Sequence, residues 1–178
     1  MYKKHASMID AVLDYKPIHH ILNSAGIERF SQYQMDMARL GIDCIVTIPH
    51  QIVQGRMEEA NTVAEQAIKD HPGKVYGYIS IVPTCGMDAV KREISRCSKI
   101  EGFLGLKFLP GYYHGALAAP EYQYAMDFAD EVGCPILCHV WGDDPKHRDI
   151  DDALKKRHNM KFIIAHQGGG DVKHTRMT

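Results

Sequence analysis

Two histidines that each end an apolar run are the residues of this sequence best suited to chemistry. The runs Pro135-Ile-Leu-Cys-His139 and Phe162-Ile-Ile-Ala-His166 place the two imidazoles 27 residues apart. Each run predicts a buried parallel strand, because four consecutive apolar residues suit a sheet that is covered on both faces. Ligands of α/β folds bind beyond the carboxyl ends of the strands. The pattern therefore predicts a metal site or an acid–base pair; otherwise both are ordinary loop histidines in a chain that has eleven.

Metal-assisted hydrolysis is the chemistry that this arrangement favours. A catalytic zinc ion takes three protein ligands and keeps an open position for water, whose pKa it lowers to about 7. His139 is the predicted ligand, and His166 is either a second ligand or the base that orients and deprotonates the water. The sequence thus predicts a divalent metal, zinc in the first place, held by His139 and His166.

Lys107 is the third candidate, with a catalytic role alongside His166. It interrupts the apolar run Phe103-Leu-Gly-Leu-Lys-Phe-Leu109, where a buried ammonium is costly unless it meets an acceptor or a metal-site carboxylate. The alternative is a lysine at a strand end whose side chain reaches solvent.

Weaker candidates lie in the segments that should follow the strands. His114 is a candidate substrate contact, and Tyr112, Tyr113 and Trp141 are candidate pocket walls. The glycine run 168–170 is either a phosphate cradle, as an open-sheet nucleotide binder would need, or a permissive turn.

A repeating unit of strand, loop and helix must position these residues. Predicted strands end at Pro49, Pro83, Pro110, His139 and His166, at intervals of 27 to 34 residues, which is the length of one such unit. Predicted helices occupy residues 27–40, 55–69, 87–100, 120–132 and 149–158. Strands that alternate with helices predict a parallel sheet.

The parallel sheet is either a doubly wound open sheet or a (β/α)8 barrel. No Gly-x-Gly-x-x-Gly follows the first strand, and the candidate residues are spread over several strand ends, which favours the barrel. A complete barrel takes about 250 residues, whereas this chain has 178. The prediction is an α/β protein with a partial (β/α)8 TIM barrel of five to six βα units, in one incomplete domain over residues 1–178.

Composition narrows the classes of partner. A net charge of −1 argues against a nucleic-acid or anionic lipid surface, no apolar stretch has the length of a membrane helix, and no signal peptide is evident. Cys44, Cys134 and Cys138 are expected to be small buried residues in a reducing compartment, so the predicted location is the cytoplasm. A thiolate cluster of Cys134, Cys138 and His139 is the alternative. The expected partner is a small-molecule substrate.

Several motifs resemble the amidohydrolase superfamily, in particular its amidohydrolase-related branch of metal-dependent hydrolases and decarboxylases. The similar stretch extends from about Gly41 to Gly170. Its motifs are Ala60-Asn61, Val82-Pro83, Gly102-x-x-Gly-Leu-Lys107, Gly133-x-Pro-Ile-x-x-His139 and Ile163-Ile-Ala-His166-x-Gly-Gly. The resemblance implies a distorted TIM barrel with one or two divalent metals, commonly zinc. It implies that His139 ligates metal, that His166 is a ligand or a water-orienting group, and that Lys107 matches a lysine that is carboxylated in some other branches.

Two features depart from the family pattern. The family's first strand ends in His-x-His, usually after Ile-Asp-Ala, whereas Ile9-Asp10-Ala11 is followed here by Val12-Leu13-Asp14, of which only Asp14 could offer a ligand oxygen. The family's strand-eight aspartate is also missing from a chain that ends at Thr178. Two hypotheses follow. The first is a metal-dependent hydrolase or decarboxylase, in which a metal-activated water attacks a C–N or C–O bond, or the metal assists decarboxylation of a small carboxylic acid. The second is a non-catalytic truncated barrel, or one piece of an enzyme completed by a homo-oligomer or a complementing chain.

Overall fold

Strands and helices alternate along the whole described part of the chain. The computed structural model describes residues 37, 39–113, 117–141 and 147–168. Its strands and α-helices are, in chain order, β1 (Ile45–Thr47), α4 (Met57–Asp70), β2 (Val75–Ile81), α5 (Met87–Cys97), β3 (Phe103–Phe108), α6 (Pro120–Val132), β4 (Pro135–Cys138), α7 (His147–Leu154) and β5 (Lys161–Ile164). Short 3-10 helices follow four of the strands: η1 (His50–Gln54), η2 (Pro83–Cys85), η3 (Pro110–Tyr113) and η4 (Ala165–Gly168). None of the described helices has the length and apolar character needed to cross a membrane.

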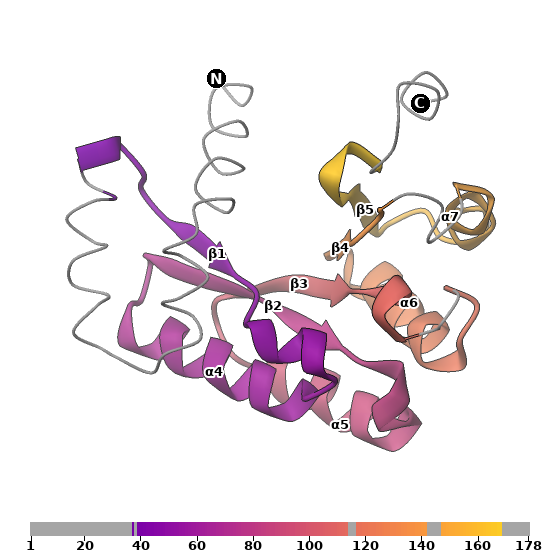
Figure 1. The fold of residues 1–178 in the computed structure, drawn as a ribbon, viewed down its shortest axis with the longest axis horizontal. Helices are drawn as coiled ribbons and strands as arrows, with labels where there is room; N and C mark the ends of the chain where they lie inside the picture. Colours follow the sequence, from indigo (N-terminus) through magenta and orange to yellow (C-terminus); the bar gives the residue numbers. More distant parts are fainter. Residues whose placement is uncertain (1–36, 38, 114–116, 142–146, 169–178) are drawn as a thin grey trace.

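The five strands form one parallel sheet whose spatial order, β1-β2-β3-β4-β5, is also the chain order. The hydrophobic core joins all four described α-helices to one face of this sheet, and Figure 1 shows α4, α5 and α6 gathered on that side. A doubly wound sheet reverses its strand order and carries helices on both faces. Sequential order with helices on a single face is instead the wall of a barrel, so the predicted partial α/β barrel is confirmed.

Alternation along β3 separates the two faces of the sheet. Leu106 and Phe108 are fully buried in the core beneath the helices, where the Phe108 ring lies 4.4 Å from the ring of Tyr122 in α6. Because successive side chains of a strand point to opposite faces, Lys107 points away from the helices. The strand register continues this second face through Ser80 of β2, which is the Cα partner of Lys107.

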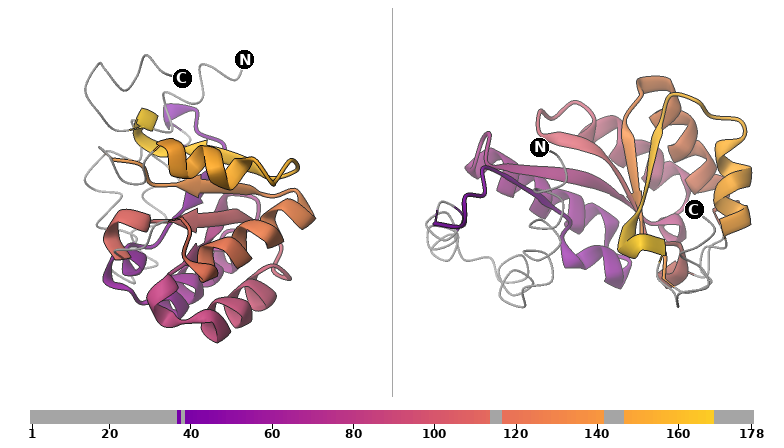
Figure 2. Two further views of the ribbon diagram at one scale, coloured as in Figure 1. Left: turned by 90° about the vertical axis from the view of Figure 1, so that its right-hand side faces the viewer. Right: turned by 90° about the horizontal axis from the view of Figure 1, so that it is seen from above.

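The C-terminal ends of β3 and β4 are tied together one residue beyond the strand pairing. Lys107 pairs with Leu137 across these strands, and the backbone N–H of His139 donates to the carbonyl oxygen of Phe108 at 2.9 Å. His139 lies two residues after Leu137 and therefore continues the face on which Lys107 lies. Both views in Figure 2 show β4 (orange) and β5 (yellow) side by side, as their strand pairing requires.

Several element boundaries differ from the sequence predictions. Helix α6 begins and ends where predicted, but α7 begins at His147 and ends at Leu154, earlier than the predicted 149–158. Pro83 and Pro110 begin 3-10 helices instead of ending strands, because proline cannot donate to the next strand pair. Most of the predicted helix 27–40, and any sixth βα unit before it, lies outside the described residues.

The prediction that Cys44 is buried is wrong. Cys44 precedes β1, the edge strand of the described sheet, and its side chain is exposed. Cys134 is half-buried and Cys138 is buried in the helix-facing core, as expected for small apolar residues.

Candidate functional site

His139 and His166 meet at the C-terminal edge of the sheet. His166 Nε2 lies 3.0 Å from His139 Nδ1, and the two ring centroids are 4.6 Å apart with the planes at 71°. The contact follows from the topology, since β4 and β5 are parallel neighbours with Cys138 opposite Ile164. The residues that follow the two strands therefore reach the same edge, as the two matching sequence motifs predict.

The backbone at His166 adopts an uncommon conformation. Its φ of 57° lies in the left-handed region, which residues other than glycine rarely adopt. Among the described residues, all others with a positive φ are glycines. Residue Gly168, with φ of 80°, completes the turn. Strained backbone of this kind is concentrated at functional sites. The described part of the glycine run is thus a turn that follows the histidine, while Gly169 and Gly170 lie outside the described residues.

Aromatic side chains form the walls of the pocket beside the histidine pair. Gly111, Tyr112, His139 and Trp141 line a pocket of about 440 Å³. The Tyr112 ring packs edge-on against His139, and the Trp141 ring packs edge-on against His166, each at 5.5 Å between centroids. The predicted walls Tyr112 and Trp141 are therefore in place, whereas Tyr113 is not among the lining residues.

Trp141 is 66% exposed and Tyr112 is 49% exposed, so both residues keep surface that a ligand can contact. The candidate substrate contact His114 lies outside the described residues.

Lys107 is buried, with 5% of its surface exposed, so the alternative of a solvent-reaching lysine is wrong. The reason is its central place in the sheet, where β2 and β4 flank it on either side. Burial lowers the pKa of Lys107 to about 8. No carboxylate within the described residues pairs with its ammonium.

His139 is held in its neutral form. Burial in the first place, then the neighbouring His166 and then Lys107, together lower the pKa of His139 to about 4. A neutral imidazole is the form that binds metal ions. Lys107 also lies near His139 on the same sheet face, because it pairs with Leu137, two residues before His139 on the neighbouring strand.

The histidine pair fits two adjacent positions around one metal ion. Two nitrogens bound at about 2.0–2.1 Å to one zinc ion are separated by roughly 2.9 Å at a right angle and roughly 3.3 Å at the tetrahedral angle, and the observed separation is 3.0 Å. The described residues contain no group of three or more histidine, cysteine or acidic side chains that could hold a metal. The alternative thiolate cluster of Cys134, Cys138 and His139 is therefore wrong, and Cys138 lies in the helix-facing core.

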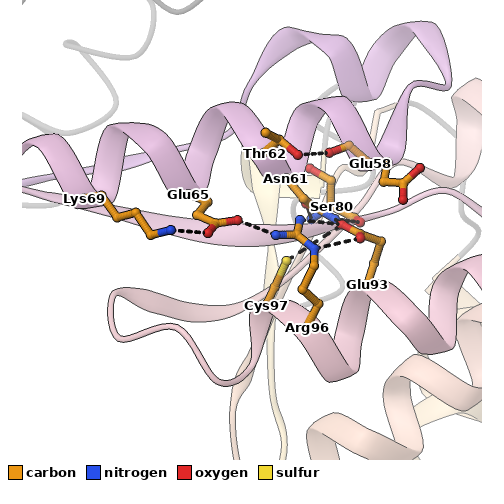
Figure 3. A network of polar contacts seen from close by, with 9 residues as sticks. All are labelled: Glu58, Asn61, Thr62, Glu65, Lys69, Ser80, Glu93, Arg96 and Cys97. Carbon is orange, nitrogen blue, oxygen red and sulfur yellow. Dashed lines mark hydrogen bonds and ion pairs between the residues drawn. The ribbon is translucent and has the colours of Figure 1, made fainter.

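A buried polar network behind the site was not predicted. The Asn61 amide of α4 accepts a hydrogen bond from the backbone N–H of Ser80 at 2.7 Å and donates to the Ser80 carbonyl at 3.3 Å and to Glu93 Oε2 at 2.8 Å (Figure 3). Strand β1 pairs with β2 only as far as Gly77. Beyond Gly77, the Asn61 amide makes the hydrogen bonds to the backbone of Ser80 that a peptide group of a neighbouring strand would otherwise make. The sequence motif Ala60-Asn61 contained the residue but gave no sign of its partners.

Ion pairs extend the network to the protein surface. Glu93 in α5 binds the Arg96 guanidinium through both carboxylate oxygens at 2.9 Å, and Arg96 forms a further ion pair with Glu65 of α4 (Figure 3). The buried charge of Glu93 is thus paired, as a buried carboxylate requires. One signal in the sequence could have revealed this network: Asn61 falls among the buried residues of an otherwise apolar helix face.

Comparisons with known proteins agree with this fold. The solved structures that resemble the chain include three of related interest. A 4-oxalomesaconate hydratase from Rhodopseudomonas palustris has 19% identity and a TM-score of 0.64, with 83% of this chain and 51% of that chain covered. A 2,6-dihydroxybenzoate decarboxylase from Rhizobium has 17% identity and a TM-score of 0.57, with 75% of this chain and 55% of that chain covered. A 5-carboxyvanillate decarboxylase from Novosphingobium aromaticivorans with bound manganese has 17% identity and a TM-score of 0.58, with 91% of this chain and 63% of that chain covered. The chain therefore spans 51% to 63% of the length of these structures. No curated protein sequence matches it.

The family assignment comes from the sequence itself. The sequence model of the family described as Amidohydrolase matches residues 31–177, which include the whole described sheet and the histidine pair. This match and the shared fold confirm the resemblance inferred from the motifs. The chain belongs to the amidohydrolase family.

Proposed function

We propose that this chain carries part of the active site of a metal-dependent hydrolase or decarboxylase, with His139 and His166 as ligands of one divalent metal, zinc in the first place. The observation that carries the proposal is the 3.0 Å approach of His139 Nδ1 to His166 Nε2 at the ends of neighbouring parallel strands. The substrate would be a small molecule bound between Tyr112 and Trp141, attacked at a C–N or C–O bond or losing a carboxyl group.

A divalent metal, when bound, acidifies a water molecule and polarises the group that reacts. The protein's part is to present two lone pairs. His139 Nδ1 and His166 Nε2 share one hydrogen, because one atom donates and the other accepts. Both atoms need free lone pairs to bind a cation, so with a metal bound the donor imidazole would carry its hydrogen on its other ring nitrogen. In the alternative role, His166 Nε2 accepts a proton from water while His139 alone binds the metal.

Lys107 contributes charge to the same site. Its pKa of about 8 leaves the ammonium mostly protonated near neutral pH. A fixed positive charge in a buried place stabilises negative charge that develops on a substrate, because little solvent screens it. We therefore assign Lys107 an electrostatic role in catalysis.

The relatives support this chemistry at a general level. Two of the three solved structures are decarboxylases, one of which contains manganese, and the third is a hydratase. Sequence identities of 17% to 19% show that these proteins share the fold of this chain, and they show no more than that. The reaction and its metal are therefore inferred from the site.

Metal content per chain tests the proposal. Protein stripped with a chelator would be incubated with zinc or manganese, freed of unbound ions and measured by elemental analysis. The parent should retain about one ion per chain, and His139→Ala and His166→Ala should each lose it. His158→Ala, at an exposed histidine outside the site, is the matched control and should bind as the parent does. Equal metal content in the parent and both site variants would contradict the proposal.

The His139→Ala variant should keep its fold. The backbone N–H of His139, and not its side chain, makes the hydrogen bond to Phe108 that joins β3 to β4. Near-ultraviolet circular dichroism would verify this.

A second candidate is a chain that becomes active only within a completed barrel. One observation favours it: the described residues offer only two clustered metal donors. The completing partner would be a second copy or a complementing chain. Light scattering during the metal titration separates the two candidates, since this one predicts that metal is retained only by an associated form.

A further inference from the structure

Two buried polar side chains lie next to each other on the sheet face opposite the helices. Lys107 is 5% exposed and Ser80 is 0% exposed, and they are Cα partners across β3 and β2. Within the described residues, Ser80 Oγ has no hydrogen-bond partner and the Lys107 ammonium has no carboxylate partner. Buried hydroxyls and ammonium groups are normally paired, because leaving them unpaired in a protein interior is unfavourable.

The position of the Ser80 hydroxyl is fixed from behind. Both backbone polar groups of Ser80 bind the amide of Asn61, which Glu93 in turn orients (Figure 3). Its neighbours Ile79 and Ile81 pack into the core beneath the helices. By alternation, the Ser80 side chain points to the opposite face, where Lys107 lies.

The same face leads to the histidine pair. Lys107 pairs in register with Leu137 of β4, and His139 follows two residues later along that strand direction. His139 also lines the pocket with Tyr112 and Trp141, and none of the described residues that line it is acidic. An ammonium and a hydroxyl thus lie on the sheet face that His139 continues, and the described residues that line the pocket include no acidic group to neutralise them.

We propose that Lys107 and Ser80 form an anion subsite that holds a carboxylate group of the substrate beside the His139–His166 pair. The proposal rests on the function proposed above and adds the residues that recognise the acid group. A carboxylate accepts several hydrogen bonds, and the ammonium and hydroxyl supply donors that the described residues leave unused. Charge-assisted hydrogen bonds of this kind are stronger than neutral ones, so the subsite should select acids over neutral analogues of the same shape.

Fluorescence of Trp141 gives a direct test, because it is the only tryptophan of the chain and it lines the pocket. Benzoate and benzamide would be titrated in the presence of a chelator. The two probes have nearly the same shape, and only benzoate carries charge. Benzoate should bind at least about tenfold more tightly than benzamide, since hydrogen bonds to charged groups are the stronger ones. Equal affinity for the two probes, or no benzoate binding, would overturn the proposal.

Variants assign the selectivity to the two residues. Lys107→Met keeps the length of the side chain and removes its charge, and it should weaken benzoate binding about tenfold or more while leaving benzamide unchanged. Ser80→Ala should weaken benzoate about threefold or more. Lys161→Met, which removes an exposed lysine from the nearby strand β5, is the matched control and should leave benzoate affinity unchanged. Unchanged benzoate affinity in Lys107→Met would overturn the proposal.

The fold of these variants is expected to survive. Methionine replaces an unpaired buried cation with an apolar group, which removes a desolvation penalty. Ser80→Ala removes one buried oxygen that lacks a partner and tests the same subsite should Lys107→Met not fold.

The test also separates this proposal from the one on which it rests. Metal binding by His139 and His166 without selectivity for benzoate would leave the proposed function standing and remove the subsite. Lys107-dependent selectivity for benzoate without metal binding would leave the subsite standing and remove the metal function.

Discussion

Replacing Asn61 should destabilise the protein more than any surface substitution on the same helix. Asn61→Ala leaves the Ser80 N–H buried without its acceptor at 2.7 Å and removes the donor that Glu93 Oε2 accepts at 2.8 Å. A buried donor without a partner costs about 1–3 kcal/mol, and a hydrogen bond to a charged group contributes about 1.5–3 kcal/mol. The longer contact to the Ser80 carbonyl, at 3.3 Å, adds little. The two contributions add to an expected loss of about 2.5–6 kcal/mol, a large share of the total stability of a domain.

Urea unfolding followed by circular dichroism measures this loss through the shift in midpoint at constant slope. Thr62→Ala, one position along α4 on its exposed side, is the control and should change stability by less than about 0.5 kcal/mol. Asn61→Asp retains the acceptor for Ser80 but turns an oxygen toward the Glu93 carboxylate, so it should destabilise at least as much as Asn61→Ala. A loss below about 1 kcal/mol for Asn61→Ala would refute the argument that its amide replaces a neighbouring peptide group.

Three further predictions concern packing, thiol chemistry and helix docking. Gly105→Ala should lower stability by about 3 kcal/mol or more, because a Cβ there would lie 2.1 Å from the Pro135 carbonyl oxygen; an unchanged Tm in thermal unfolding would contradict this. Cys85 is exposed, whereas burial raises the pKa of the Cys97 thiol to about 12. Peptide mass spectrometry should therefore find Cys85 alkylated much faster than Cys97 at about pH 8, and equal rates would contradict the burial of Cys97. Arg157→Met should speed amide hydrogen exchange in α7 but not in α4, because the Arg157 guanidinium joins α6 to the end of α7; unchanged exchange in α7 would count against that role.

The strands and the histidine pair could be predicted because both depend on local pattern and on the geometry of parallel sheets. An apolar run of four residues indicates a buried strand wherever it occurs, and the ends of neighbouring parallel strands must meet. The boundaries were less certain because they depend on where pairing stops. His139 extends its ladder by one hydrogen bond beyond β4, whereas His166 already lies in a 3-10 turn.

The environment of Lys107 could not be decided from its own strand. Whether a lysine near a strand end reaches solvent depends on the strands beside it, and here Ser80 and Leu137 flank it on both sides. The partners of Asn61 could not be predicted from the sequence either, since Ser80 and Glu93 lie 19 and 32 residues away along the chain. Only the assembled contact between α4, β2 and α5 defines them.

Because the backbone at His166 is left-handed, the residue that would be best for stability at this position differs from the residue that the proposed chemistry needs. Glycine adopts this conformation freely and asparagine does so more readily than histidine, so either replacement relieves strain on the order of 1 kcal/mol. A laboratory selection for heat resistance alone should therefore enrich glycine or asparagine at position 166. A selection that also demands turnover should return histidine there. The residue recovered at this single position would report which of the two pressures had acted on the chain.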